Sequence, residues 1–294
     1  MWSLPAAPAA PLPSVASTPV LHTLFQNLQN AYTRYRVVVT SARHRVASLW
    51  EDYTTAWLRG ETQMPLRLKR WYDSYSGVGD DATTSEGMAE PYIGSLLADP
   101  PPRMAVLGLN PGAYVPAFQA RDGIFAKEIG RYGSYRAWAS SGPYHRPPWT
   151  DEHGPNRFHR SRLAFTRAWL QDADADHSDL LIVVCYPWHS PKISAKFAPP
   201  IELIEEYVWQ PLAELPVGEI FAFGRPWNHI ASALGLRPLQ MLGAGGDGYG
   251  SRVASRAVRT YGLESGQRLV VEWHTGRAGP PGAAETEILR KALQ

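Results

Sequence analysis

The chain contains one cysteine and no long hydrophobic run, and each of these absences excludes a class of protein. Cys185 is alone among 294 residues, which excludes an intrachain disulfide and a cysteine cluster for zinc or an iron–sulfur centre. No apolar run approaches the length that crosses a bilayer, so we expect no membrane partner. The formal net charge of +2 is small, and the sum of charges therefore identifies no partner.

Composition divides the chain into four predicted parts. Residues 1–19 are rich in Ala and Pro and lack a basic start, which predicts a disordered leader in a cytoplasmic protein and not a secretory signal. Residues 20–76 carry hydrophobic side chains at helical spacing, which predicts a helical extension. Residues 77–89, rich in Gly, Asp, Thr and Ser, are predicted to form a linker. This leaves 90–294 as the main domain.

The most informative stretch is Met104–Gly112, in which an apolar run ends in Gly-Leu-Asn-Pro-Gly. Gly108 and Gly112 permit close backbone approach or a positive φ, and Pro111 fixes its own φ. A turn of this kind can direct the Asn110 amide at a ligand beyond the carboxyl end of a parallel strand. An ordinary strand-to-helix turn would give the same pattern.

Further apolar runs, separated by helical stretches, each end in a polar or glycine-rich loop. Four such strands predict an α/β fold with a doubly wound, mainly parallel central sheet, in which function lies at the carboxyl ends of the strands. The three runs after the first are Leu180–Val184, Ile220–Gly224 and Arg268–Trp273.

The Asn110 motif resembles the first active-site motif of the uracil-DNA glycosylase superfamily, nearest to its mismatch-specific members. Glu90-Pro91-Tyr92-Ile93-Gly94 stands upstream, as in many bacterial members. Bacterial relatives that act on hypermodified phage bases serve in antiviral defence. The resemblance implies a DNA glycosylase that extrudes a nucleotide and hydrolyses its N-glycosidic bond without a cofactor or metal. It assigns water positioning to Asn110, and His274, after the last strand, is our candidate donor to the departing base.

Other residues near the strand ends are the candidates for base binding. We expect Phe118 or Phe125 to stack on a base, and Asn110, His189 or Ser190, and His274 to meet in one cleft. The full candidate set for substrate binding is Gly108, Leu109, Pro111, Gly112, Phe118, Phe125, Tyr186, His189, Ser190, Thr275 and Arg277.

Departures from the family pattern bear on the substrate. Uracil-specific members have a tyrosine where this chain has Gly112, and an asparagine near the position of Cys185. Room beside pyrimidine C5 and the extra guanidinium of Arg277 favour a C5-substituted pyrimidine, such as a glucosylated hydroxymethylcytosine, excised in defence against phage. The alternatives are a uracil or mismatch glycosylase of base-excision repair, a non-catalytic nucleic-acid-binding module of the same fold, and an unrelated α/β hydrolase or nucleotide-binding protein.

Arginines interleave with aromatic residues between 121 and 167, a mixture that favours DNA because arginine neutralises phosphate and rings stack on unpaired bases. For any single residue, a solvated helix face or a packed loop explains the pattern as well. Arg252, Arg256 and Arg259 have the spacing of one helix face. The predicted DNA contacts, to a duplex with a flipped base or to a single strand, are Arg157, Arg160, Arg162, Arg225, Arg252 and Arg256. We expect no obligate protein partner.

Overall fold

A computed structural model describes residues 41–77, 82–193, 197–243, 256–274 and 279–294. Residues 41–294 form one compact unit. The predicted leader over residues 1–19 and residues 20–40 of the predicted helical extension lie outside the described residues.

The core of this unit is a seven-stranded mixed sheet in the order β1-β3-β2-β4-β7-β6-β5. The central strands β3, β2, β4 and β7 are parallel, while β1, β6 and β5 pair antiparallel with their neighbours. The α/β class is therefore confirmed. The strands are β1 Tyr92–Ile93, β2 Met104–Gly108, β3 Leu180–Val184, β4 Glu219–Phe223, β5 Arg237–Gly243, β6 Arg256–Gly262 and β7 Arg268–His274.

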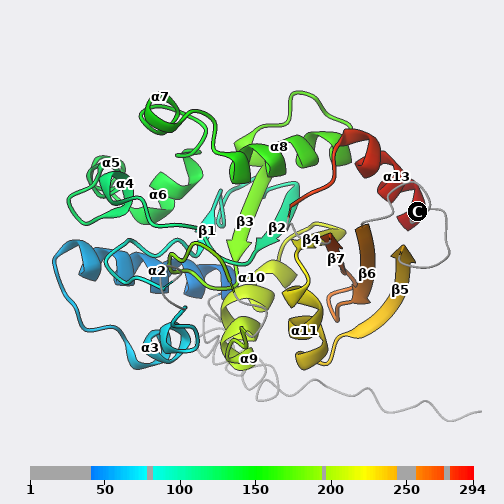
Figure 1. Cartoon of the computed structure of the whole chain (residues 1–294), viewed down its shortest axis with the longest axis horizontal. Coiled ribbons are helices and arrows are strands. Elements are labelled where there is room, and N and C mark those ends of the chain that lie inside the picture. Colours follow the sequence, from blue (N-terminus) through cyan, green and yellow to red (C-terminus); the bar gives the residue numbers. More distant parts are fainter. Residues whose placement is uncertain (1–40, 78–81, 194–196, 244–255, 275–278) are drawn as a thin grey trace, which may run out of the picture. The chain divides into compact units, whose positions relative to one another are not determined.

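Helices cover both faces of the sheet (Figure 1). One face packs against α8 and α13, with Phe165 and Leu289 against Val106 and Phe221. The other face carries the larger core beneath α2, α9, α10 and α11. The helices are α2 Ala42–Leu58, α3 Leu66–Asp73, α4 Pro116–Gln119, α5 Ile124–Tyr132, α6 Tyr135–Ser140, α7 Trp149–His153, α8 Arg157–Leu170, α9 Ile201–Ile204, α10 Gln210–Ala213, α11 Pro226–Ala233 and α13 Ala283–Leu293, with η2 His177–Asp179 and the π-helical turn η3 Glu205–Trp209.

The described part of the helical extension shares a core with the α/β domain. Trp50 of α2 and Trp71 of α3 are buried against Trp188, with ring centroids 6.0 Å from it in each pair. The predicted linker also joins the domain, because Thr84 forms a bridge to His189. The helices predicted within residues 20–76 are thus present as α2 and α3, and they belong to the same compact unit as residues 90–294.

Three strands, β1, β5 and β6, were not predicted. The expectation that Arg256 and Arg259 share a helix face is wrong, because both lie on β6. Side chains alternate between the faces of a strand, so residues three apart point to opposite sides of the sheet. Among the described residues, no helix is long and apolar enough to cross a membrane.

Candidate functional site at the carboxyl edge of the sheet

The chain after β3 follows the Asn110 turn closely, which gives the carboxyl edge of the sheet a defined shape. The amide of Cys185 donates to the carbonyl of Gly108 at 2.9 Å, and the amide of Ser190 donates to the carbonyl of Gly112 at 2.9 Å. Gly112 has φ +96°, a left-handed conformation that glycine adopts without strain. The turn is thus fixed at both ends by the segment that follows β3.

The side-chain amide of Asn110 has a single orientation in this frame. Its Nδ2 donates to the carbonyl oxygen of Ser190 at 2.6 Å. Because a carbonyl can only accept, the NH2 group must face Ser190 and the amide oxygen Oδ1 must face away from it. Within the described residues Oδ1 accepts no hydrogen bond, and the side chain is half-buried. This arrangement leaves an acceptor available to hold a water molecule.

His274 lies at the same edge of the sheet as Asn110. The register pairs Leu107 with Ala222 and Phe223 with Glu272, so continuing it places Asn110, Arg225 and His274 at one level. One strand, β4, separates β2 from β7, and two strand spacings span roughly 10 Å. His274 is half-buried and Arg225 is exposed. Asn110 and His274 therefore lie at the same edge of the sheet, and their meeting in one cleft stays a prediction.

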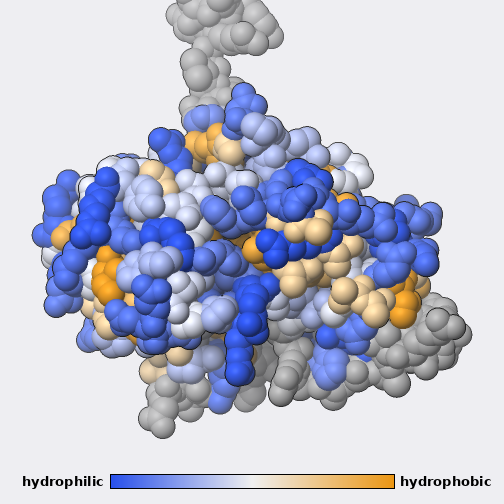
Figure 2. Space-filling view, turned by 90° about the horizontal axis from the view of Figure 1, so that it is seen from above, coloured by the Kyte–Doolittle hydropathy of each residue, from blue (hydrophilic) through white to orange (hydrophobic). Residues whose placement is uncertain are grey.

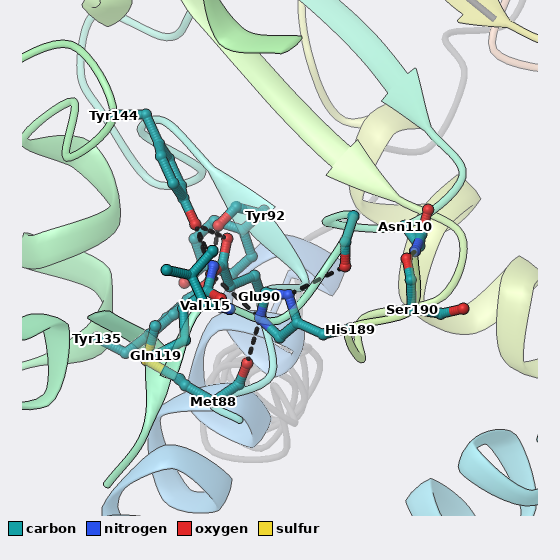
Figure 3. Close-up of polar contacts among 11 residues, drawn as sticks. Met88, Glu90, Tyr92, Asn110, Val115, Gln119, Tyr135, Tyr144, His189 and Ser190 are labelled. Carbon is teal, nitrogen blue, oxygen red and sulfur yellow. Dashed lines mark hydrogen bonds and ion pairs between the residues drawn. The ribbon is translucent and has the colours of Figure 1, made fainter. Parts of the chain in front are cut away.

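A buried carboxylate, Glu90, lies beside the turn (Figure 3). Tyr144 Oη donates to both oxygens of Glu90, at 2.6 and 2.8 Å, and Gln119 Nε2 donates to Oε1 at 3.1 Å. Burial, and secondly the charge of Glu90, raise the pKa of Tyr144 well above its usual value, so this phenol remains a donor. The carboxylate is thus compensated by surrounding donors despite its burial.

His189 connects this carboxylate to the Asn110 turn. Its Nε2 lies 3.0 Å from the carbonyl of Met88 and 3.3 Å from Glu90 Oε1, and its Nδ1 lies 3.3 Å from the carbonyl of Gly112. The imidazole is fully buried. The prediction that His189 binds substrate is therefore contradicted: its ring holds backbone in place. It fixes the Gly112 carbonyl, which also accepts the amide of Ser190.

Ser190 likewise serves the turn instead of a ligand. It is 1% exposed, its carbonyl accepts Asn110 Nδ2, and its Oγ donates to the carbonyl of Lys192. His189 and Ser190 therefore both lie beside the Asn110 turn, as predicted. Both contact backbone groups of the turn and its neighbours, or Asn110 itself, and their predicted contact with a base is contradicted.

The prediction that Phe118 or Phe125 stacks on a base is wrong. Both rings are fully buried in an aromatic cluster with Trp149, whose ring centroid lies 4.9 Å from that of Phe118 and 5.9 Å from that of Phe125. Large aromatic rings bury much apolar area, and both of these rings bury theirs in the core of the α4–α7 segment.

Tyr186 is also unavailable to a substrate, because it is fully buried and its hydroxyl donates to the carbonyls of Tyr72 and Tyr75. Leu109 is half-buried and packs against the core, and Pro111 is half-buried. Gly112 leaves space, since a Cβ there would meet no atom within 4 Å. The space that was predicted beside Gly112 is thus present.

Gly108 has a structural role that the sequence did not reveal. A Cβ at this position would lie 3.0 Å from Cζ of Phe158 and 3.2 Å from Cγ1 of Val184. The missing side chain therefore admits the half-buried ring of Phe158, from the first turn of α8, to the end of β2. Phe158 is thus an aromatic residue beside the strand end that leads into the Asn110 turn.

The arginines of α8 divide into two groups. Arg157 and Arg160 are exposed, and their predicted contacts with DNA remain predictions. Arg162 is 3% exposed, so the prediction that it contacts DNA at the surface is wrong. Its guanidinium carbon lies 3.3 Å from the ring centroid of Phe158. Burial lowers the pKa of Arg162 to about 9.

The face seen in Figure 2 is mainly hydrophilic, with hydrophobic side chains in small separate groups. Most basic residues of the 121–167 segment, which was predicted to bind DNA, are exposed to solvent. Most of its aromatic residues are instead buried in the core. The exposed basic residues are Arg121, Lys127, Arg131, Arg136, Arg157, Arg160 and Arg167, and the buried aromatic residues are Phe125, Tyr135, Trp138, Tyr144, Trp149 and Phe165.

Arg256 is not available to DNA as predicted. Its guanidinium lies 2.7 Å from Glu272 and 3.0 Å from Glu285, so it ties β6 to β7 and α13. Three further residues with predicted contacts lie outside the described residues: Arg252, Thr275 and Arg277. In the described ranges, no group of three His, Cys, Asp or Glu side chains could hold a metal ion.

The sequence analysis missed Gln119, Tyr144 and Phe158 as parts of the site, and gave Glu90 no role. Glu90 had a signal, because a carboxylate flanked by Ala89 and Pro91 in an apolar stretch needs buried donors. Comparison with protein-family models, with curated proteins and with solved structures finds no match to this chain.

Proposed function

We propose that this protein is a DNA glycosylase that hydrolyses the N-glycosidic bond of an extruded, C5-substituted pyrimidine and leaves an abasic site. The observation that carries the proposal is the Asn110 amide at the carboxyl edge, which is anchored through Nδ2 while its Oδ1 accepts no hydrogen bond from the described residues. An acceptor so placed can orient a water molecule toward the anomeric carbon. An amide is a weak proton acceptor, so its contribution is to position the water and not to ionise it.

The other groups at this edge suit the charges of the reaction. Cleavage develops positive charge on the sugar and negative charge on the base. His274 lies at the end of β7, with β4 between it and β2, and we assign it to the other end of the nucleotide. Exposed Arg157 and Arg160 on α8 and Arg225 before α11 offer cations for the DNA backbone.

Two observations favour a C5-substituted pyrimidine over uracil. No side chain fills the space at Gly112. The segment where uracil-specific relatives carry an asparagine here holds Cys185 and Tyr186, both fully buried. Neither can read the edge of uracil. A role in phage defence follows from such a substrate and belongs to the proposal.

A gel assay for alkali-labile abasic sites tests the proposal on uracil-containing, mismatched and phage-modified DNA. We expect strand breaks with the modified DNA. Asn110→Ala should lower the rate at least roughly hundredfold, because the lost contact acts in the transition state. Its affinity for uncleaved DNA should stay within about twofold of that of the wild type. Asn110→Asp is the matched variant, since its carboxylate can still hold water but loses the Ser190 bond.

Three outcomes would contradict parts of the proposal. Efficient release of plain uracil with no action on modified DNA would replace defence with base-excision repair. Full activity of Asn110→Ala would remove Asn110 as the water holder. DNA binding without base release from any substrate would indicate the non-catalytic module.

A further inference from the structure

Arg162 is a buried cation without an anionic partner. Within the described residues no carboxylate lies at ion-pair distance from its guanidinium, which is 3% exposed. Its Nη1 donates to the carbonyl of Phe158 at 3.0 Å, and its Nε has no hydrogen-bond partner. Burial of an unpaired charge is costly, so a cation in this position needs a compensating role.

The guanidinium is held at the end of α8 that faces the candidate site. Residues Phe158 and Arg162 are four apart, so the Arg162 side chain reaches back toward the helix N-terminus. That end lies at the carboxyl edge, since the ring of Phe158 meets the position of Gly108 at the end of β2. At the opposite end, Arg103 before β2 pairs with Asp172 after α8 at 2.7 Å. The charge is therefore directed to the edge that carries Asn110.

The ring of Phe158 lies between this charge and the strand end. The guanidinium stacks on the ring at 3.3 Å from its centroid and lies 5.8 Å from the ring of Phe223 at the end of β4. Phe158 is half-buried, and Gly108 and Val184 adjoin its tip. A cation bound to one face of an aromatic ring draws electron density toward itself, which favours electron-rich or anionic groups beside that ring.

We infer that Arg162, acting through Phe158, stabilises the anionic pyrimidine that departs on cleavage of the N-glycosidic bond. This inference rests on the proposed function. In the step, water adds to the anomeric carbon and the carbon–nitrogen bond breaks. Its electron pair stays on the base, and the proton of the water passes to the base or to solvent. Arg162 does not touch the base; its positive charge lowers the energy of the departing anion.

The size of the effect follows from electrostatics. At an effective dielectric constant of about 20, a unit charge on the order of 10 Å from a developing anion changes a rate on the order of tenfold. The effect is largest for bases that are poor leaving groups, because they carry most charge in the transition state. Dependence on leaving-group acidity therefore separates this role from simple support of the fold.

The test compares wild type, Arg162→Met and Arg160→Met in single-turnover base release. The substrates are two matched pairs in otherwise identical DNA: uracil with 5-fluorouracil, and 5-hydroxymethyluracil with 5-formyluracil. The second base of each pair is the better leaving group. Arg162→Met should lose roughly tenfold or more on the poorer leaving group and clearly less on the better one. Arg160→Met, exposed on the same helix, should lose similar amounts on both members of a pair.

Thermal unfolding gives a second readout. Methionine fills the volume of the guanidinium stem without burying a charge, so Arg162→Met should melt at or above the wild-type temperature. A fall of more than about 5 °C would show that Arg162 supports the fold and would overturn the inference. Equal rate losses on both members of each pair would also overturn it. A wild-type protein that releases no base at all contradicts the proposed function, and the role of Arg162 fails with it.

Discussion

Two buried charges flank the Asn110 turn, and they differ in how they are compensated. Glu90 and Arg162 are each 3% exposed. Glu90 accepts hydrogen bonds from Tyr144 and Gln119 and lies beside His189, whereas Arg162 donates one bond to a carbonyl and faces two aromatic rings. Glu90, which is surrounded by hydrogen-bond donors, holds the nearby backbone in place. The positive charge of Arg162, which has no counterion among the described residues, can act on a ligand bound nearby.

The largest expected effect on stability comes from removing Glu90, the buried charge that is compensated by hydrogen bonds. Glu90→Ala removes the acceptor shared by Tyr144, Gln119 and His189, so it should lower the free energy of unfolding by about 3–5 kcal/mol. Denaturant unfolding measures the change. Glu90→Gln, which keeps the volume and one acceptor oxygen, should lose less. A loss below about 1 kcal/mol in the alanine variant would show that the network does not stabilise the fold.

The next effect concerns histidines behind Tyr144. His159 stacks on Tyr144 with ring centroids 4.2 Å apart, and His145 lies 6.0 Å from His159. Burial, followed by the charge on neighbouring His177, lowers the pKa of His145 to about 4, and burial also lowers that of His159 well below its usual value. Unfolded histidines take up protons below about pH 6.5, whereas these do so only at lower pH when folded.

Stability should therefore fall as the pH decreases from about 6.5 toward 4, and should not change through these groups above pH 7. Melting temperatures measured between pH 7.5 and pH 5 test this expectation. His145→Gln should reduce the pH dependence, because glutamine does not titrate. An equally steep fall in the variant would assign the loss to other groups.

The smallest expected effect is at Gly112. Its φ of +96° strains any other residue although a Cβ would meet nothing within 4 Å. Gly112→Ala should therefore cost about 1–2 kcal/mol of stability. Gly112→Tyr should carry the same backbone cost, so its melting temperature should also fall. The open space beside Gly112, taken alone, would suggest an unchanged melting temperature. Loss of modified-base release in the tyrosine variant with activity kept in the alanine variant would show a steric role. Equal losses in both would show a conformational one.

Sequence patterns predicted the parallel part of the sheet well, because each central strand is a continuous apolar run bounded by turn residues. β5 was missed since its first residues are exposed, Arg237 to Met241, and have no apolar alternation. β6 was missed because Arg256 and Arg259 matched a helical spacing. The position of Asn110 at the carboxyl edge of the sheet was predicted from the Gly-Leu-Asn-Pro-Gly turn that ends the first apolar run.

The rest of the site depends on side-chain placement that no local pattern fixes. Phe118 and Phe125 were plausible stacking residues until the structure showed them in the core, while Phe158 reached the strand end only through the missing side chain of Gly108. The partners of Glu90 come from positions 29 and 54 residues further along the chain. Contacts at such separations follow from tertiary packing, which the sequence does not display.

The place of β7 in the sheet has a consequence for how the protein is made. β7 lies between β4 and β6 and pairs with both along its length, yet it is synthesised after the other six strands of this sheet. Until Arg268–His274 leaves the ribosome, β4 has only β2 as a neighbour, and β6 lacks the partner that joins it to the parallel strands. His274 and Asn110 therefore come to one edge only after all seven strands of the sheet have been synthesised. A nascent or truncated chain holds the Asn110 turn without the other half of the site.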